Sequence, residues 1–485
     1  MSSPRLWTRV RCVDVARTLQ YLARSEPVPI NVIVDPKLNI EAVITVVPAT
    51  KRIESLILRL ESSDLPRVLH GFVTTAPALE RLEISATPRL QRASRRRLQV
   101  EPNIPAGFLG GSAPALKSLK LNGVNTKLTF SEFSSLTHLT LITNTQIFEL
   151  SDLFRVFTSA KLLEEVSIQF SGPTSPIPER QGVITLPRMK RLGFSNTARK
   201  FPKRLLALLD VPSVKEVKLE ISLPGADTRT IRDFQLQNFP HLVEVDSLEL
   251  DVPRARCNIR FGGPGGVISV HASRSGTWEQ NYGFHSHWLE SLDPMSIADV
   301  RDLTLRSYYP TEWLDQYPVF KSLGTLDGLR SLVVERCNNT AVIEALSPTE
   351  KGSVLFPHLE SLTFQLITEP TEIFPDLTEM ARARAQMGSP LSKVTSDIHT
   401  TFRRSDVDAL QRYVNCVELN TSADPPSSES VNAYMATVRV FSEKSPPSRL
   451  YLNLVFFVLR FSRVQHQLRR MDLVGSPKDP RRREA

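Results

Sequence analysis

The chain has 485 residues and a hydrophobic content of 41%, which is enough for a core and excludes wholesale disorder. It carries 60 Lys and Arg against 51 Asp and Glu, so its formal net charge of +9 permits contact with nucleic acid or acidic lipids. Two runs contribute much of this charge, and we interpret them as a solvated loop and a solvated terminus: Arg95, Arg96 and Arg97, then Lys478, Arg481, Arg482 and Arg483.

The first 35 residues do not follow the pattern that organises most of the chain. Val15, Leu19 and Leu22 have helical spacing and predict a helix over residues 13–23. Pro27 and Pro29 then end this helix. Residues 1–35 therefore form a distinct N-terminal segment in this interpretation.

From residue 30 to 252, and again from residue 300, the chain repeats a short pattern: an apolar anchor followed by apolar residues three and five positions later. In five copies a proline stands two residues before the anchor, and these anchors are Leu79, Leu116, Met189, Val214 and Leu359. The anchors without this proline are Ile53, Leu136, Leu163, Val300 and Leu329. An L-x-x-L-x-L core that recurs near a period of ~20–29 residues is the signature of a leucine-rich repeat.

The spacing within a copy predicts how it folds. Leu119 and Leu121 share one face of a strand, whereas Lys120 points to the other face. We expect the proline before an anchor to end the preceding helix. A single unit cannot bury its own apolar face, so stacked units share one core. The predicted fold is therefore α/β: an irregular leucine-rich-repeat solenoid, or horseshoe, over residues 36–420, with a parallel concave sheet and helices or loops on the convex side.

Two helices are predicted between these strands, over residues 151–157 and 203–210. Around Leu242 and Val245 two phases of the repeat pattern fit the sequence. We therefore expect a bulge or a shifted register there.

The pattern lapses over residues 253–295, which we interpret as a degenerate pair of repeats or an insertion. The run Gly262-Gly263-Pro264-Gly265-Gly266 lacks the Gly-Lys-Ser/Thr ending of a phosphate loop and predicts a turn. Residues 267–272 alternate like a half-exposed strand. His285 and His287 have no further Cys or His at ligand spacing nearby, so we expect no metal site.

After the repeat resumes at Val300, a helix is predicted over residues 372–387 and a last copy of the pattern at Val414. Residues 421–485 are expected to form a linker and a basic, partly disordered tail.

The sequence offers no motif for catalysis. Both the G-x-S-x-G nucleophile elbow and the H-E-x-x-H zinc motif are absent, so we expect neither enzymatic activity nor a cofactor. The four cysteines are far apart, with no secretory signal ahead of them, which favours free thiols and an intracellular location, cytoplasmic or nuclear. No stretch approaches the ~20 apolar residues of a membrane helix, so we expect no membrane contact.

The concave face of the predicted sheet is the candidate binding surface. Its side chains carry both signs of charge, which favours a protein target over nucleic acid, whose groove should be uniformly basic with aromatics. The predicted partner-binding residues are Arg81, Glu83, Lys120, Asn122, His138, Glu165, Gln169, Arg191, Glu216, Lys218, Arg306 and Gln365.

Three N-terminal stretches precede the irregular repeats: Pro4-Arg5-Leu6-Trp7, residues 21–25 (Tyr-Leu-Ala-Arg-Ser) and residues 29–32 (Pro-Ile-Asn-Val). In this order they resemble the end of an F-box and the segments after it in fungal F-box/leucine-rich-repeat proteins of the basidiomycete type. The resemblance covers roughly residues 1–420. In that family the F-box begins with an apolar helix that docks the Skp-type adaptor of a cullin ubiquitin ligase. Here that helix is missing, so residues 1–35 look like an F-box remnant.

The resemblance implies a non-enzymatic substrate-recognition subunit of a Skp–cullin–F-box ubiquitin ligase that binds a protein target on its concave face. A Skp-type adaptor and a cullin are expected partners only if the missing F-box lies upstream. One alternative is a ligase-independent leucine-rich-repeat binding protein. A second is a nucleic-acid-associated protein, which the basic charge and the arginines at 95–97 suggest.

Overall fold

The computed structural model describes residues 3–35, 40–87, 101–125, 133–143, 150–170, 182–195, 205–223, 242, 244–252, 256–274, 299–307, 323, 326–335, 337, 339–349, 352–365, 373–396 and 404–419. The chain divides into two compact units, Met1–Asn420 and Thr421–Ala485, and every described residue lies in the first. The arginines at 95–97, the pair His285 and His287, and the predicted linker and tail lie outside the described residues.

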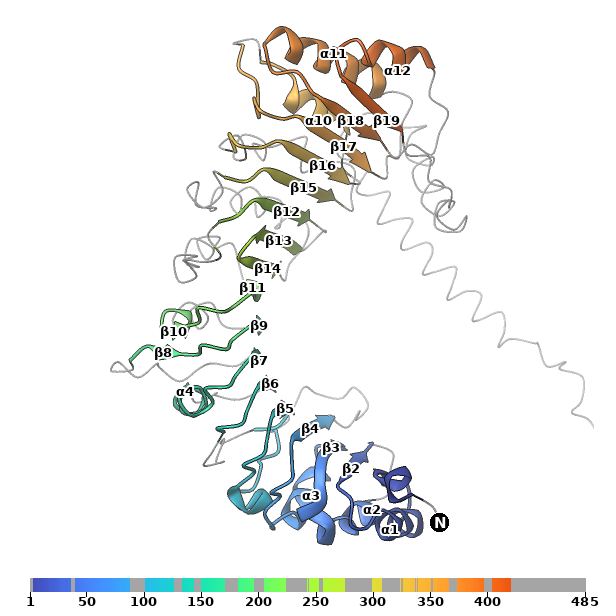
Figure 1. Ribbon diagram of the computed structural model, residues 1–485, viewed down its shortest axis with the longest axis vertical. Helices are drawn as coiled ribbons and strands as arrows, with labels where there is room; N and C mark the ends of the chain where they lie inside the picture. Colours follow the sequence, from blue (N-terminus) through green and yellow to red (C-terminus); the bar gives the residue numbers. More distant parts are fainter. Residues whose placement is uncertain are drawn as a thin grey trace, which may run out of the picture. The chain divides into compact units, whose positions relative to one another are not determined.

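The first unit is a mixed α/β structure built on one 17-stranded, mostly parallel sheet, which confirms the predicted class (Figure 1). In spatial order its strands are β1 (Arg9–Arg11), β2 (Ile30–Val34), β3 (Ile53–Glu61), β4 (Arg81–Thr87), β5 (Ser118–Asn122), β6 (His138–Thr143), β7 (Glu165–Phe170), β9 (Arg191–Ser195), β11 (Glu216–Leu223), β14 (Gly266–Arg274), β13 (Arg256–Gly263), β12 (Ser247–Val252), β15 (Asp302–Ser307), β16 (Ser331–Glu335), β17 (Ser361–Gln365), β18 (Lys393–Ser396) and β19 (Cys416–Leu419).

The repeated strands are entered through one kind of turn. The N–H of Leu79 donates to the carbonyl of Ala76 at 3.1 Å, and the anchors Leu116, Leu136, Leu163, Met189, Val214, Leu329 and Leu359 do the same three residues back. Each of the five prolines is the second residue of such a turn, where its fixed φ is favourable. The prediction that the proline ends a preceding helix is therefore wrong, because it forms the turn into the next strand.

The apolar positions of successive copies stack in register. Leu82 lies beside Leu119 and Leu119 beside Leu139, and each is at most 1% exposed. The residue just before each proline also belongs to the core, as Ala76 and Phe356 show. Stacked copies therefore share one apolar interior, because each copy buries its apolar face against its neighbours.

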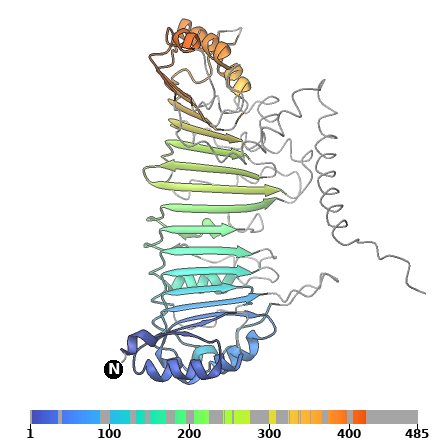
Figure 2. The same cartoon turned by 90° about the vertical axis from the view of Figure 1, so that its right-hand side faces the viewer.

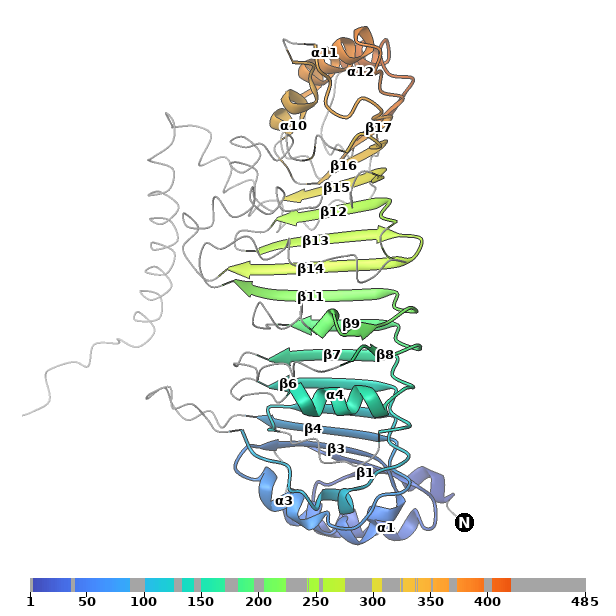
Figure 3. The ribbon, with the colours of Figure 1, turned by 90° about the vertical axis from the view of Figure 1, so that its left-hand side faces the viewer.

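The copies are interrupted by a hairpin between β11 and β15. Strand β13 runs antiparallel to both β12 and β14, while β14 is parallel to β11 and β12 is parallel to β15 (Figure 3). The glycine run forms the turn between β13 and β14, as predicted. A Cβ at Gly263 would lie 1.9 Å from the carbonyl oxygen of Glu244, so only glycine fits there.

The expected register shift near Val245 does not occur in the pairing of β12, which is regular with both neighbours. Leu248 and Leu250 are buried, so the chain uses the phase that starts at Val245. A register shift lies instead between Ile30 and Asn31, where β2 meets β3.

Helices lie at both ends of the strand stack and beside its middle (Figure 2). They are α1 (Val15–Arg24), α2 (Ile40–Ile44), α3 (Leu65–Gly71), α4 (Leu150–Ser159), α10 (Asn339–Leu346), α11 (Ile373–Gln386) and α12 (Arg404–Leu410), with short 3-10 turns at Pro4–Trp7, Val47–Arg52 and Phe108–Gly111. The predicted helices near 13–23, 151–157 and 372–387 are confirmed. The helix predicted over 203–210 is confirmed only at residues 205–206, and it is wrong at its end, because Leu209–Asp210 form β10, which pairs with β8 (Ile184–Thr185).

A buried arginine ties the last helices to the sheet. Arg384 on α11 is 0% exposed and donates to the carbonyl oxygens of Leu346 (3.3 Å), Leu355 (2.8 Å) and Phe356 (2.8 Å). Burial lowers its pKa to about 10. The guanidinium thus satisfies carbonyls at the end of α10 and in the turn before β17, which fixes that turn against α11.

Candidate binding surface

The face of the sheet opposite the core, here called the open face, carries three rows of side chains. Rows one, two and three contain the residues two, four and six positions after each anchor. Register keeps each row continuous from strand to strand: Glu83 on β4 lies beside Lys120 on β5, and Lys120 lies beside Thr140 on β6. In the regular strands these residues alternate with buried ones, so they point away from the core.

The structure places all twelve predicted residues on the open face. Row one holds Arg81, His138, Glu165, Arg191 and Glu216, row two holds Glu83, Lys120 and Lys218, and row three holds Asn122, Gln169, Arg306 and Gln365. They are spread over many strands from β4 to β17 rather than gathered at one point, and that distribution suits an extended contact.

Glu83 differs from the other predicted residues because its side chain is only 4% exposed. Arg59 lies 3.2 Å away, Arg81 3.2 Å and Lys120 3.6 Å, and these three cations, here called the basic cluster, are 46%, 55% and 43% exposed. The expectation that Glu83 contacts a partner directly is thus corrected. Its carboxylate is an internal counter-ion that holds three cations from adjacent strands.

The electrostatics of Glu83 follow from this arrangement. Burial alone raises the pKa of its carboxyl group, but the charge of Lys120 and the hydrogen bonds from Arg59 and Arg81 outweigh burial and hold the pKa below its ordinary value. The carboxylate therefore stays ionised at neutral pH.

Farther along the face, predicted residues form ion pairs, either across strands or, for Lys218, within one strand. The carboxylate of Glu165 accepts from Arg191, and His138 lies 3.9 Å from it. The hydrogen bond and charge of Glu165 raise the pKa of Arg191. Lys218 pairs with Glu220 at 2.7 Å. These pairs are largely exposed, so they order the surface more than they stabilise the fold.

A chain of hydrogen bonds crosses the hairpin in row three. Asn258 Nδ2 donates to Asp251 Oδ2 at 2.9 Å, and Asn258 Oδ1 accepts from His271 Nδ1 at 2.9 Å. Burial, followed by the charge of Lys218, lowers the pKa of His271. The imidazole is therefore neutral at pH 7. The hydrogen bonds of Asn258 to Asp251 and His271 make row three continuous across the antiparallel strands.

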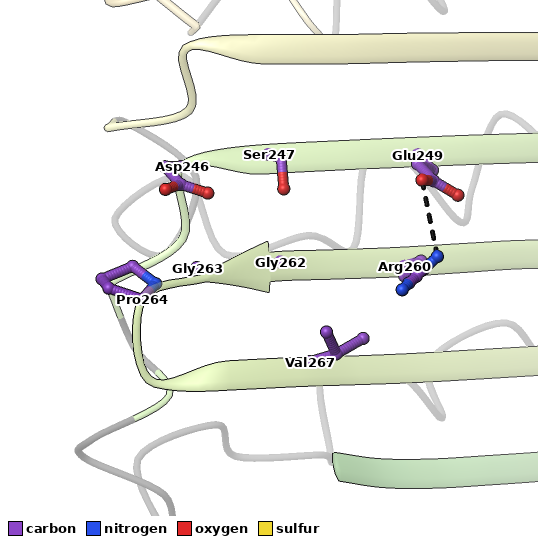
Figure 4. Close-up of a pocket in the computed structure, with 8 residues that line it drawn as sticks. All are labelled: Asp246, Ser247, Glu249, Arg260, Gly262, Gly263, Pro264 and Val267. Atoms are coloured by element: carbon purple, nitrogen blue, oxygen red, sulfur yellow. Dashed lines mark ion pairs between the residues drawn. The ribbon is translucent and has the colours of Figure 1, made fainter. Parts of the chain in front are cut away.

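The hairpin also creates a pocket of about 370 Å³ on the open face (Figure 4). Glu249 and Arg260 form an ion pair at 3.6 Å along one side, and Gly262 provides no side chain between β12 and β14. The pocket can accept a side chain of a bound partner. Its lining residues are Asp246, Ser247, Glu249, Arg260, Gly262, Gly263, Pro264 and Val267.

Sequence reasoning missed several residues of this surface. Arg59 stands six positions after the anchor Ile53, so the rule that selects Asn122 and Gln169 also selects it. Asn258 and Arg260 do not follow an anchor at the spacing of the repeat pattern, because their strand, β13, runs in the opposite direction.

Groups that could support catalysis are scarce in the part of the chain that the structure describes. No set of three or more His, Cys, Asp or Glu side chains there is arranged to hold a metal ion. Cys12 is a buried free thiol, and burial raises its pKa to about 12 although Thr18 hydrogen-bonds to it. Such a thiol is a packing residue rather than a nucleophile.

The chain matches no protein-family model and no curated protein. The likeness to F-box/leucine-rich-repeat proteins therefore stays a prediction. Among the helices that are described, none has the length and apolar character required to cross a membrane.

Proposed function

We propose that this chain is a non-enzymatic interaction scaffold, a leucine-rich-repeat solenoid that recruits a protein target on its open face. The observation that carries the proposal is the open face itself: three continuous rows of mainly polar side chains across a sheet whose other face forms the core. A surface this extended suits a partner that makes many distributed contacts.

The solenoid part of the proposal is supported by the sameness of the copies. The anchors from Leu79 to Val214, and Leu329 and Leu359, enter their strands through the same kind of turn. On either side of the hairpin, the two apolar residues that follow each anchor stack in parallel register with those of the neighbouring copy. Repeats that contact mainly their neighbours build such a structure.

A protein target is favoured over nucleic acid by the chemistry of the rows. Both signs of charge occur in them, as at Glu165 and Arg191. No Phe, Tyr or Trp stands in the three rows at any described position, and bases bound without a duplex usually stack on aromatic rings.

The similarity to ubiquitin-ligase substrate receptors rests on the N-terminal segments. Trp7 packs edge-on against Tyr21 with ring centroids 5.2 Å apart, and the guanidinium of Arg24 lies 4.3 Å from the Trp7 ring. Two of the segments that carry the resemblance therefore contact each other. A ligase-independent scaffold would use the same open face.

Affinity purification from the host tests the scaffold. The variants Gln169→Arg and Gln365→Arg place a new charge in row three, and Arg155→Gln on α4, which packs on the core side, is the control. We expect proteins that copurify with the unaltered chain and with Arg155→Gln to be lost from the row-three variants. If both row-three variants retain the full set, the open face is not the binding surface.

The ligase part is tested separately by purifying the chain alongside a version extended with its upstream coding sequence. Copurification of a Skp-type adaptor and a cullin with the extended version supports a substrate receptor. Their absence from both versions leaves a ligase-independent scaffold.

A further inference from the structure

Charge is distributed unevenly along the open face. In the three rows, the stretch from β1 to β5 carries five cations, Arg9, Arg11, Arg59, Arg81 and Lys120, against two carboxylates, Asp35 and Glu83. From β6 to β11 there are two cations, Arg191 and Lys218, against Glu165, Glu216 and Glu220. The remaining strands likewise have slightly more carboxylates than cations: Arg260, Arg306 and Lys393 against Glu249, Asp251, Asp302, Glu335 and Glu418.

Among the described strands, the β1–β5 end of the open face is therefore the basic one, and its cations are more accessible than one of its two carboxylates. Glu83, one of its two carboxylates, is 4% exposed, whereas the cations of the basic cluster are about half exposed. A ligand approaching this end would meet the cations first.

We propose that the β1–β5 end of the open face binds an acidic, Asp- and Glu-rich peptide segment of the protein target. This inference rests on the proposed function and specifies which part of the open face binds which kind of segment of the target. Charge complementarity carries it, because Arg81 donates to Glu83 through one nitrogen and keeps donors for a further carboxylate. Arg59 contacts Glu83 through two nitrogens and lies 3.8 Å from Asp35, so it contributes mainly its positive charge.

The buried carboxylate also organises the cluster before a ligand arrives. Arg59 donates to Glu83 through two nitrogens at 3.3 and 3.2 Å, and Arg81 donates to the other carboxylate oxygen at 3.2 Å. Side chains already held in place lose less conformational entropy on binding. Glu83 therefore lowers the net charge of the site but raises its order.

The dimensions and neighbours of the cluster favour a peptide. Five adjacent strands span about 20 Å, the length of about six extended residues. Ile33 and Ile57 lie in row two between Arg11 and Glu83 and are partly exposed, so they offer apolar contact to the peptide's other side chains. A nucleic-acid strand would find no aromatic ring in these rows at the described positions.

The test uses the full chain and fluorescence anisotropy of a labelled ten-residue peptide in which Glu and Thr alternate, with a Gln-for-Glu peptide as control. We expect the Glu peptide to bind, the Gln peptide to fail, and Arg81→Gln or Lys120→Gln to weaken binding about tenfold, the effect of one charge-assisted hydrogen bond. Lys393→Gln is the matched control, because Lys393 lies on the same face and is 42% exposed against 43% for Lys120. It should leave binding unchanged.

For Glu83→Gln we expect the opposite change in peptide affinity. Removing the internal carboxylate should strengthen binding of the Glu peptide several-fold, provided that circular dichroism shows the folded sheet. If Glu83→Gln does not fold, the Arg81 and Lys120 variants decide the question, since each leaves Glu83 with two cations.

Three results would overturn the inference: equal binding of both peptides, an equal loss in Lys393→Gln and Lys120→Gln, or tighter binding of a ten-nucleotide single-stranded DNA that is lost in the same two variants. The first two leave the proposed scaffold intact if Gln169→Arg still loses copurified proteins. Retention of those proteins in every open-face variant contradicts the scaffold itself.

Discussion

The stretch from β3 to β9 and the hairpin of β12, β13 and β14 build the same surface by different routes. In the first stretch all neighbouring strands are parallel, and the described anchors enter their strands through the same turn. In the hairpin, β13 is antiparallel to both neighbours. Row three nevertheless passes from Glu220 through His271, Asn258 and Asp251 to Arg306.

In both regions alternation along a strand, rather than strand direction, determines which side chains lie on the open face. Both parallel and antiparallel pairing preserve the two-residue period when the register is right. The hairpin differs in its local requirement: its tight two-residue connection needs glycine, whereas the turn into a parallel copy forms with proline, as before Leu79, or without it, as before Leu136.

The largest expected effects test whether the two regions share one core. Phe194→Ala on β9 should lower the free energy of unfolding by about 3–5 kcal/mol, because it leaves a cavity at a side chain that is 1% exposed. Phe261→Ala on β13, where the side chain is 4% exposed, should cost a similar amount. Urea denaturation of both variants measures this. A much smaller loss at Phe261 would mean that the hairpin lies outside the common core.

The next effect concerns the backbone of the hairpin. Gly263→Ala should destabilise the protein by about 3 kcal/mol, because the added Cβ would lie 1.9 Å from the carbonyl oxygen of Glu244. Gly193→Ala on β9 is the control, since its nearest new contact is 3.7 Å. Thermal unfolding should separate the two variants. Equal midpoints would show that the hairpin tolerates a side chain at this turn.

The internal counter-ion of the parallel stretch has a smaller, pH-dependent effect. Glu83→Gln should cost about 2 kcal/mol at pH 7, less than a fully buried pair because its cations are half exposed. The folded-state pKa of Glu83 is lowered from 4.5, so its contribution is present above that value and is lost as the pH falls through the lower folded-state pKa.

Denaturation at several pH values measures this contribution. The difference between the unaltered chain and Glu83→Gln should shrink as the solution is acidified. A difference that stays constant from pH 7 to pH 3 would show that Glu83 does not act through its charge.

The smallest effect belongs to the hairpin's histidine. Burial and the charge of Lys218 lower the pKa of His271 from 6.5, against the opposing charges of Glu220 and Asp251. The unfolded chain therefore takes up this proton first, and stability should fall as the pH drops below about 6.5. His271→Asn should remove that slope. If the slope between pH 7 and 5 is the same in His271→Asn, another group causes it.

The regular part of the fold was predictable because one physical constraint recurs. Each anchor, with the residues three and five positions later, must be buried, so the spacing specifies strand and face together. The same rule placed Lys120 and Gln169 correctly on the open face. The sequence also marked residues 267–272 as a half-exposed strand and the glycine run as a turn.

Features that depend on pairing between distant strands could not be predicted. The sequence around Asn258 and Arg260 does not indicate that β13 runs antiparallel, since polar and apolar residues alternate in the same way in parallel and antiparallel strands. The burial of Glu83 depends on Arg59, Arg81 and Lys120, which approach from three strands. Leu209–Asp210 have helix-like spacing with their neighbours, but pairing with Ile184–Thr185 makes them a strand.

Site-specific photo-crosslinking in the host can test whether a protein partner contacts the open face. A photoreactive phenylalanine analogue would replace Thr140, in row two of β6, or Arg155, on α4 at the core side. We expect discrete crosslinked proteins at Thr140 that are absent at Arg155. Crosslinks at Arg155 with none at Thr140 would contradict this expectation.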